Sequence, residues 1–180
     1  MIYCLPGRKI YYFFSEKRVD KSVNICYNLG TEKERKLIEM KIWFDMDGTI
    51  ADLYGVEDWL PMLRNSDPTP YRVAKPLVRM QSLARLLNRL QREGYEIGIV
   101  SWLSKTSTAE YDEAVTEAKL EWLAKHLASV KFDTIDIIAY GTPKQDGRDG
   151  ILFDDEAKNR EAWTGTAFDV DKIIEVLKAL

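Results

Sequence analysis

The stretch Lys41-Ile42-Trp43-Phe44-Asp45-Met46-Asp47-Gly48-Thr49 decides the fold of this chain and points to its chemistry. Its first part, residues 41–44, is an apolar run typical of a short buried strand. Asp45 and Asp47 follow, and a turn at Gly48 would bring both carboxylates to one pocket. Carboxylates removed from water repel each other and lose hydration, so such a pair usually serves a metal ion or a reaction. Taken alone, the same residues also fit an ordinary acidic turn.

The composition is that of one globular domain. The chain has 180 residues, 46% of them hydrophobic and 31% charged, which allows a sizeable core. A net charge of −3 gives no electrostatic case for binding nucleic acid or an anionic membrane. No apolar run approaches the roughly 20 residues that span a bilayer. Cys4 and Cys26 are too few for a disulfide framework and favour a reducing cytoplasm, and the single His126 is interpreted as structural.

Residues 1–40 differ from the rest of the chain because they show no sustained helical or strand period. Tyr11-Tyr12-Phe13-Phe14 is a candidate short strand without an obvious partner. One interpretation is a disordered or loosely docked N-terminal extension. The other is a misassigned start. Met40 directly precedes the first core strand, and Glu32-Lys33-Glu34-Arg35-Lys36 can be encoded by purine codons alone, as a bacterial ribosome-binding site would be.

After Met40 the chain alternates predicted strands and helices, the pattern of a parallel sheet with helices on both sides. Gly94 ends a helix predicted over residues 77–93, and Thr108 caps one predicted over residues 107–127. Their inward faces are expected to carry Leu77, Met80, Leu83, Leu86, Leu87 and Leu90 in the first helix, and Ala114, Ala118, Leu120, Leu123 and Leu127 in the second.

The other expected elements are strands at 41–44, 95–100, 135–140, 151–153 and 166–168, a helix near 156–163, and a last helix that starts at Asp169 or Asp171. The sequence therefore predicts an α/β fold over residues 41–180, a Rossmann-like three-layer sandwich with a mainly parallel sheet.

Each of the first four predicted strands ends at a side chain suited to phosphate or metal. In an open α/β sheet, ligands bind outside the carboxyl ends of the strands. The residues at these ends are, in chain order, Asp45 with Asp47, Ser101, Lys144, and Asp154-Asp155. Separately, Ser101 fits a turn, Lys144 a solvated charge and Asp154-Asp155 a helix cap. Together, at matching positions, they predict one chemical site.

In this order the residues resemble the four motifs of the haloacid dehalogenase-like (HAD) superfamily, over residues 41–180. The first motif, DxDGT, is matched by Asp45–Thr49 without departure. The second, a Ser or Thr after an apolar strand, is matched by Ser101. The third, a Lys after the next strand, is best matched by Lys144, since Lys131 lies before that strand. The fourth, paired acids, is matched by Asp154-Asp155, with Asn159 at a position that is often polar.

The resemblance implies a Mg²⁺-dependent phosphatase that works through an aspartyl-phosphate. Asp45 would be the nucleophile, and Asp47 would protonate the leaving oxygen and then activate water. The magnesium ligands would be the Asp45 carboxylate, the backbone carbonyl of Asp47, and Asp154, with Asp155 bound directly or through water. This all-oxygen shell suits the ion. Haloalkanoate dehalogenases lack an acid at the position of Asp47, so this residue favours phosphate esters.

Two further roles come with the resemblance. Ser101 would donate a hydrogen bond to a phosphoryl oxygen. Lys144 would neutralise charge on the phosphate and keep Asp45 ionised. We also expect Gly48, Thr49 and Trp102 to contact the substrate, Trp102 by stacking on a base or sugar unless it fills the core.

Substrate choice in this family lies in cap insertions, and residues 52–76 are the only candidate for one. Prolines at 61, 68, 70 and 76 predict a minimal cap with one short helix at 53–63 and a fairly open site. Candidate substrate contacts, each also readable as a surface or cap-core residue, are Tyr54, Trp59, Arg64, Tyr71, Arg72 and Lys75. The string DMDGTIADL, Asp45–Leu53, resembles the opening of 5′-deoxyribonucleotidase-type members, which implies a nucleotide or similar small phosphomonoester.

A second class of function fits the same residues. A phosphate-and-magnesium pocket can hold a phosphorylated ligand, such as a nucleotide, without hydrolysing it quickly. The acid at Asp47 argues against this binding module, because a pure binder has no use for an acid–base group. A purely structural protein would leave the four-part site unexplained.

The misassigned-start hypothesis is tested by mass spectrometry of the natively expressed protein. The expected N-terminus is Met40, and a native N-terminus at Met1 contradicts the hypothesis.

Overall fold

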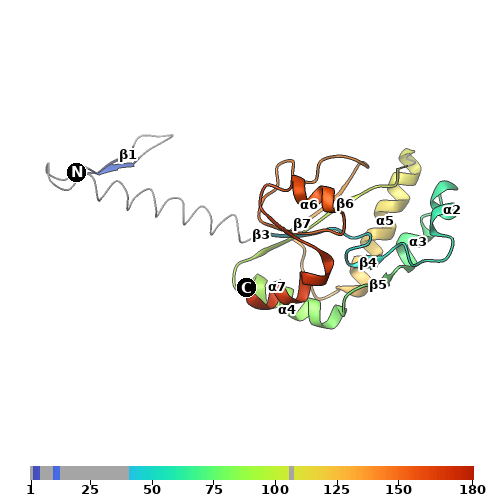
Figure 1. Cartoon of the computed structure of the whole chain (residues 1–180), viewed down its shortest axis with the longest axis horizontal. Coiled ribbons are helices and arrows are strands. Elements are labelled where there is room, and N and C mark those ends of the chain that lie inside the picture. Colours follow the sequence, from blue (N-terminus) through green and yellow to red (C-terminus); the bar gives the residue numbers. More distant parts are fainter. Residues whose placement is uncertain (1, 5–9, 13–40, 106–107) are drawn as a thin grey trace. The chain divides into compact units, whose positions relative to one another are not determined.

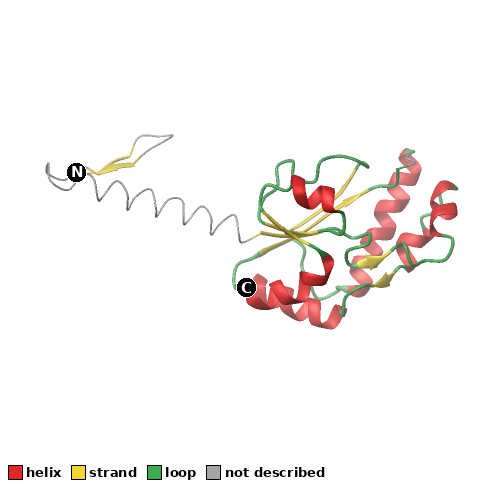
Figure 2. Cartoon of the chain, in the orientation of Figure 1, coloured by secondary structure: helices red, strands yellow, loops and turns green. Residues whose placement is uncertain are grey.

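The computed structural model describes residues 2–4, 10–12, 41–105 and 108–180 (Figures 1 and 2). The chain divides into two compact units, Met1–Ile38 and Glu39–Leu180. In the first, β1 (Ile2–Cys4) and β2 (Ile10–Tyr12) form an antiparallel pair with Tyr3 opposite Tyr11. The aromatic run therefore has a partner, contrary to the expectation, because three-residue strands are too short to show a period. The expectations about residues 13–40 lie outside the described residues.

A five-stranded parallel sheet forms the centre of the second unit. Its strand order is β7 (Thr134–Ile138), β6 (Glu96–Trp102), β3 (Lys41–Phe44), β8 (Ile151–Phe153) and β9 (Thr166–Phe168), and every neighbouring pair is parallel. The chain runs from β3 outward to β6 and β7, then returns to β8 on the other side of β3. Such a reversal makes a switch point where ligands bind in open α/β sheets. The predicted α/β fold with a parallel sheet is confirmed.

One face of the sheet carries most of the helical cover. There α4 (Met80–Arg92), α5 (Ala109–His126) and α7 (Ile173–Ala179) share a core with alternate residues of β3, including Ile42 and Phe44. Strand alternation sends Trp43 to the opposite face, where it packs with Leu152 and Trp163. Figure 1 shows α6 (Ala157–Ala162) on the other side of the sheet from α4 and α7. The three layers agree with the prediction.

Two helices differ from their predicted form. α4 begins at Met80 rather than at residue 77, and Leu77 is 47% exposed instead of inward. The cause is a long-range pairing, because the Leu77 N–H donates to the Ile50 carbonyl and draws this part of the chain into an extended path. In α5, Thr108 caps the helix as predicted by accepting a hydrogen bond from the Tyr111 N–H. The inward face is rotated, however, so that Leu120 is 41% exposed.

The remaining boundaries are close to the prediction. β6 extends to Trp102, and β7 ends at Ile138. The last helix begins with a 3-10 turn, η1 (Val170–Lys172), whose first N–H is capped by Asp169.

The segment between β3 and α4 forms an insertion with a closed base. β4 (Ala51–Asp52) begins the insertion and β5 (Lys75–Pro76) ends it, and these two strands pair with each other. Between them lie α2 (Trp59–Arg64) and α3 (Thr69–Val73), where the prediction had a single helix over 53–63. Pro68 and Pro70 stand at the start of α3, where a missing N–H breaks no helical hydrogen bond, so they begin this helix rather than prevent it.

Among the described residues, no helix is both long enough and apolar enough to cross a membrane.

Gly98 in β6 lies against the Trp43 ring, and this contact predicts a stability effect. A Cβ at Gly98 would lie 2.5 Å from ring carbons of Trp43, whose Nε1 donates a 3.0 Å hydrogen bond to the Asp149 carbonyl. Because the indole is anchored, we expect Gly98→Ala to lower the free energy of unfolding by about 1–3 kcal/mol in urea denaturation. In a Trp43→Leu background the same change should cost clearly less. Equal costs in both backgrounds would contradict this packing explanation.

Candidate active site

The carboxyl ends of β3, β6 and β8 and the loop after β7 bring the predicted site residues together. Asp45 follows β3 directly, and its N–H donates to the Phe153 carbonyl at the end of β8. That backbone bond fixes the start of the DxDGT turn beside Asp154. Ser101 is the penultimate residue of β6, and Lys144 lies in the β7–β8 connection.

Lys144 is the central cation of the site. Its Nζ lies 3.0 Å from Asp45 Oδ1 and 2.7 Å from Asp154 Oδ2. The lysine is 3% exposed and Asp154 is fully buried. Burial alone would lower the pKa of Lys144, but Asp45 and Asp154 outweigh it and raise that pKa above its ordinary value. Lys144 is therefore charged and bridges the two acids. Lys131, the weaker candidate, is exposed.

Three carboxylates form a cluster that suits a divalent cation. Asp45, Asp154 and Asp155 each offer one oxygen, and these oxygens lie within 4.8 Å of one another. Hard oxygen donors of this kind fit Mg²⁺ or Ca²⁺ better than softer metals. The backbone carbonyl of Asp47, the fourth expected ligand, accepts no hydrogen bond from the described residues. Burial first, then the charge of Asp45, raises the pKa of Asp154.

Thr49 and Gly48 hold Asp155 in this cluster. The Thr49 hydroxyl donates to Asp155 Oδ1 at 3.2 Å and accepts from the Asp155 N–H at 3.1 Å. Thr49 is fully buried, so its side chain positions the acid instead of facing a ligand. Gly48 has φ +79°, and a Cβ there would lie 2.4 Å from Asp155 Oδ2. Both residues were expected to contact substrate, and the structure gives each a supporting position.

The loop after β8 is braced from α6. Asn159 donates from Nδ2 to both Asp154 oxygens at 3.1 Å, and the Glu156 N–H donates to Asp154 Oδ1 at 2.9 Å. Arg160 donates to the carbonyls of Asp154 and Asp155 at 2.8 and 2.7 Å. The acids therefore sit on a rigid turn.

Asp47 has a cationic partner that sequence reasoning missed. Lys119 of α5 is fully buried, and its Nζ donates to Asp47 Oδ2 at 2.6 Å, Ser101 Oγ at 2.8 Å and the Trp102 carbonyl at 2.7 Å. Burial raises the pKa of Asp47, an effect that Lys119 opposes and the charge of Asp45 reinforces. The signal was present in the sequence: Lys119 lies four residues after the buried Val115 and three before the buried Trp122, on the inward stripe of the helix.

A pocket of about 400 Å³ opens onto Asp45 and Asp47. Lys144 also lines it, as do the insertion and the loops after β6 and β7. Of the predicted substrate contacts it includes Tyr54, Trp59, Arg64, Tyr71 and Trp102. Its size lies at the lower end of the range for small-molecule sites.

The other predicted contacts lie elsewhere. Arg72 is ion-paired with Glu121 on α5, and Lys75 is exposed on β5. Ser101 is fully buried, accepts a hydrogen bond from Lys119 and is absent from the pocket lining.

Trp102 is held in place at the pocket wall. Its Nε1 donates to the Thr142 carbonyl at 2.8 Å, and Lys144 Nζ lies 4.7 Å from its ring centroid. Tyr140 packs against it at 5.2 Å between ring centroids. Trp102 thus both covers Lys144 and contributes to the pocket wall.

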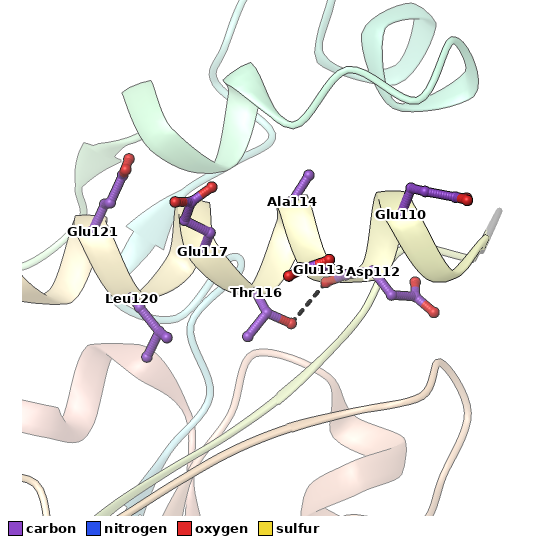
Figure 3. Close-up of a pocket in the computed structure, with 8 residues that line it drawn as sticks. All are labelled: Glu110, Asp112, Glu113, Ala114, Thr116, Glu117, Leu120 and Glu121. Carbon is purple, nitrogen blue, oxygen red and sulfur yellow. Dashed lines mark hydrogen bonds between the residues drawn. The ribbon is translucent and has the colours of Figure 1, made fainter.

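A larger hollow of about 710 Å³ runs along the exposed face of α5 (Figure 3). Its acidic lining includes Glu110, Glu113, Glu117 and Glu121, and none of the predicted site residues belongs to it. A phosphate would be repelled there. The smaller pocket is therefore the candidate active site.

No protein-family model matches the sequence, and no curated protein matches it significantly. The solved D,D-heptose 1,7-bisphosphate phosphatase from Burkholderia thailandensis is 11% identical, covers 77% of this chain and 96% of its own, and gives a TM-score of 0.47. A solved protein from Vibrio cholerae is 20% identical, covers 77% of this chain and 97% of its own, and gives a TM-score of 0.40. At these scores neither similarity bears on the reaction of this chain.

The acid cluster predicts that metal binding depends on pH. Burial, then Asp45 and Asp154, raises the pKa of Asp155 to about 6. This folded-state pKa lies above that of an unfolded Asp, so the contribution of Asp155 to the stability of the ion-free fold decreases as pH rises from about 4 to about 6. A cation must displace the bound proton, so we expect Mg²⁺ to raise the melting temperature more at pH 7.5 than at pH 5.

Asp155→Asn should remove most of the Mg²⁺ effect and raise the ion-free melting temperature at pH 7.5. Asp171→Asn, which changes an exposed acid outside the site, is the matched control and should behave as wild type. An equal Mg²⁺ effect at both pH values contradicts the assignment of Asp155 to the ion.

Proposed function

We propose that this chain is a Mg²⁺-dependent phosphomonoesterase of the HAD type that forms an aspartyl-phosphate on Asp45. One observation carries the proposal: Lys144 bridges Asp45 and Asp154, and Lys144 and Asp45 line a pocket together with Asp47. A buried carboxylate cluster with its own lysine is costly to maintain for structure alone. Perturbed acids in a cleft are typical of a reaction site.

Asp45 is the proposed nucleophile. It lines the pocket although only 5% of it is exposed, so a substrate bound in the pocket can reach its carboxylate. Lys144 at 3.0 Å keeps its carboxylate paired and lies beside the position of an incoming phosphoryl group. Attack by a carboxylate oxygen on phosphorus forms the acyl phosphate and releases the alcohol.

Asp47 is the proposed acid–base residue. The raised pKa of Asp47, caused mainly by burial, favours the protonated form that can donate to the leaving oxygen. After the alcohol leaves, the same carboxylate can take a proton from the water that hydrolyses the intermediate. Asp47 lines the pocket beside Asp45, as both steps require.

The cluster of Asp45, Asp154 and Asp155 is the proposed Mg²⁺ site. When bound there, the ion supplies positive charge that reduces repulsion between the nucleophile and the phosphate dianion. Asn159 and Arg160 keep the acids of the β8 loop in place. Ser101 does not line the pocket, so we propose that it supports the site through Lys119, from which its oxygen accepts a hydrogen bond, instead of donating to a phosphoryl oxygen.

The pocket walls favour a small substrate with a flat ring, such as a nucleotide. Tyr54 and Trp59 of the insertion stack edge to face at 5.1 Å between centroids, and Trp102 and Tyr140 form a second aromatic pair. Aromatic walls bind rings and sugars through their faces. Arg64 and Lys105 add positive charge to the lining. The two cysteines are consistent with a cytoplasmic enzyme.

Phosphate release from a panel of nucleotides and sugar phosphates, with and without Mg²⁺, tests the proposal. Metal-dependent release from at least one ester is expected. Tight binding of a phosphorylated ligand without release would instead identify the binding module.

Two substitutions separate the proposed roles. Asp45→Asn should abolish turnover while leaving the fold intact, since no other carboxylate takes its place. Asp47→Asn should slow the reaction by about 10² to 10⁴ through loss of acid–base catalysis. Circular dichroism checks folding, and phosphate release measures the rates. Full activity of Asp45→Asn would refute the nucleophile assignment.

A further inference from the structure

We propose that Lys119 is a positioning residue for the acid–base step, a role that rests on the proposed phosphatase function. The four motifs leave this lysine without a task, and it belongs to a helix rather than to a strand end. It nevertheless contacts the proposed acid, Asp47, and the buried Ser101 at the end of β6 at once.

All three ammonium hydrogens of Lys119 are used. They go to Asp47 Oδ2 at 2.6 Å, Ser101 Oγ at 2.8 Å and the Trp102 carbonyl at 2.7 Å. A lysine ammonium has three donors and no acceptor, so this set is complete. The three acceptors come from the β3 turn and the end of β6. Lys119 therefore fixes the distance between these two segments.

The insertion covers this contact. The Tyr71 ring of α3 lies 5.0 Å from Lys119 Nζ, and Tyr71 is 4% exposed. Its neighbours in the same cluster include Tyr111, Val115 and Ala118 on α5. Burying an ammonium here costs free energy that an apolar side chain of similar size would avoid. The geometry thus favours a role for Lys119 in positioning Asp47 over a role in packing the core.

The contact makes the two Asp47 oxygens unequal. Oδ2 accepts from Lys119, while Oδ1 receives no hydrogen bond from the described residues, and Asp47 lines the pocket. Because the ammonium can only donate, the proton of the acid form must sit on Oδ1. Lys119 therefore orients the acid so that its proton is on the oxygen available to the leaving group.

Lys119 and Lys144 pair with different acids of the site. Lys144 contacts Asp45 and Asp154, the nucleophile and a metal ligand. Lys119 forms its ion pair with Asp47. Loss of Lys119 should therefore impair proton donation without removing the nucleophile or the cation site.

The test compares two esters in Lys119→Met. One is an alkyl phosphate, whose leaving oxygen needs a proton, and the other is 2,4-dinitrophenyl phosphate, whose leaving group does not. The value of kcat/KM reports steps up to departure of the leaving group, so later hydrolysis of the intermediate does not enter. We expect a loss of about 10- to 100-fold for the alkyl ester, part of the acid–base contribution, and less than about threefold for the aryl ester.

Three controls sharpen the comparison. Lys125→Met makes the same chemical change at an exposed position of α5 and should alter neither ester. In an Asp47→Asn background, Lys119→Met should change the ratio of the two esters little, because its effect runs through Asp47. If Lys119→Met does not fold, Lys119→Gln replaces it. Its amide loses the charge and one of the three donors, so a smaller loss is expected, again confined to the alkyl ester.

Equal losses on both esters, or an undiminished effect in the Asp47→Asn background, overturn the positioning role while leaving the phosphatase proposal standing. A wild-type protein that releases phosphate from neither ester overturns both.

Discussion

The buried ammonium of Lys144, held between Asp45 and Asp154, is the contact on which the rest of the site depends. Three carboxylate oxygens, from Asp45, Asp154 and Asp155, lie within 4.8 Å of one another and repel each other, because burial leaves little water to screen their charges. Each such ion costs several kcal/mol to desolvate, at the order-of-magnitude level, unless its charge is compensated. Lys144 compensates part of that charge, and a cation at the cluster would compensate more. The acids, the lysine and the ion therefore form one interdependent set.

The scaffold supplies what this set requires. β3 lies between β6 and β8, so the residues that follow it meet those of both neighbours at the switch point of the sheet. Gly48 allows Asp155 to approach the turn, and Thr49 ties the two loops together. The insertion then covers the acid–base side of the site through Tyr71 and supplies one wall of the pocket. The carboxyl ends of the strands position the charged residues, and a short insertion forms part of the pocket around them.

The sequence predicts the parts of this arrangement that follow from local pattern. Apolar runs located the strands, and the rule that parallel strands end at one edge brought Asp45, Lys144 and Asp154 together. The prediction from sequence failed where contacts between distant residues determine the local structure. Leu77 is exposed because β5 pairs with β4, a contact with no local signal. Lys119 was missed because α5 contributes residues to both the core and the site. The buried face of this helix therefore includes a charged residue, which a search for hydrophobic periodicity does not select.

Trapping the phosphoryl-enzyme tests the central claim most directly. Wild type mixed with substrate and Mg²⁺ is quenched within the first turnover, reduced with borohydride and digested for mass spectrometry. Borohydride converts an aspartyl-phosphate to homoserine, so the account predicts homoserine at position 45, and none there in the Asp45→Asn variant. A turning-over enzyme with the modification at another residue, or with Asp45 unmodified throughout, would contradict it.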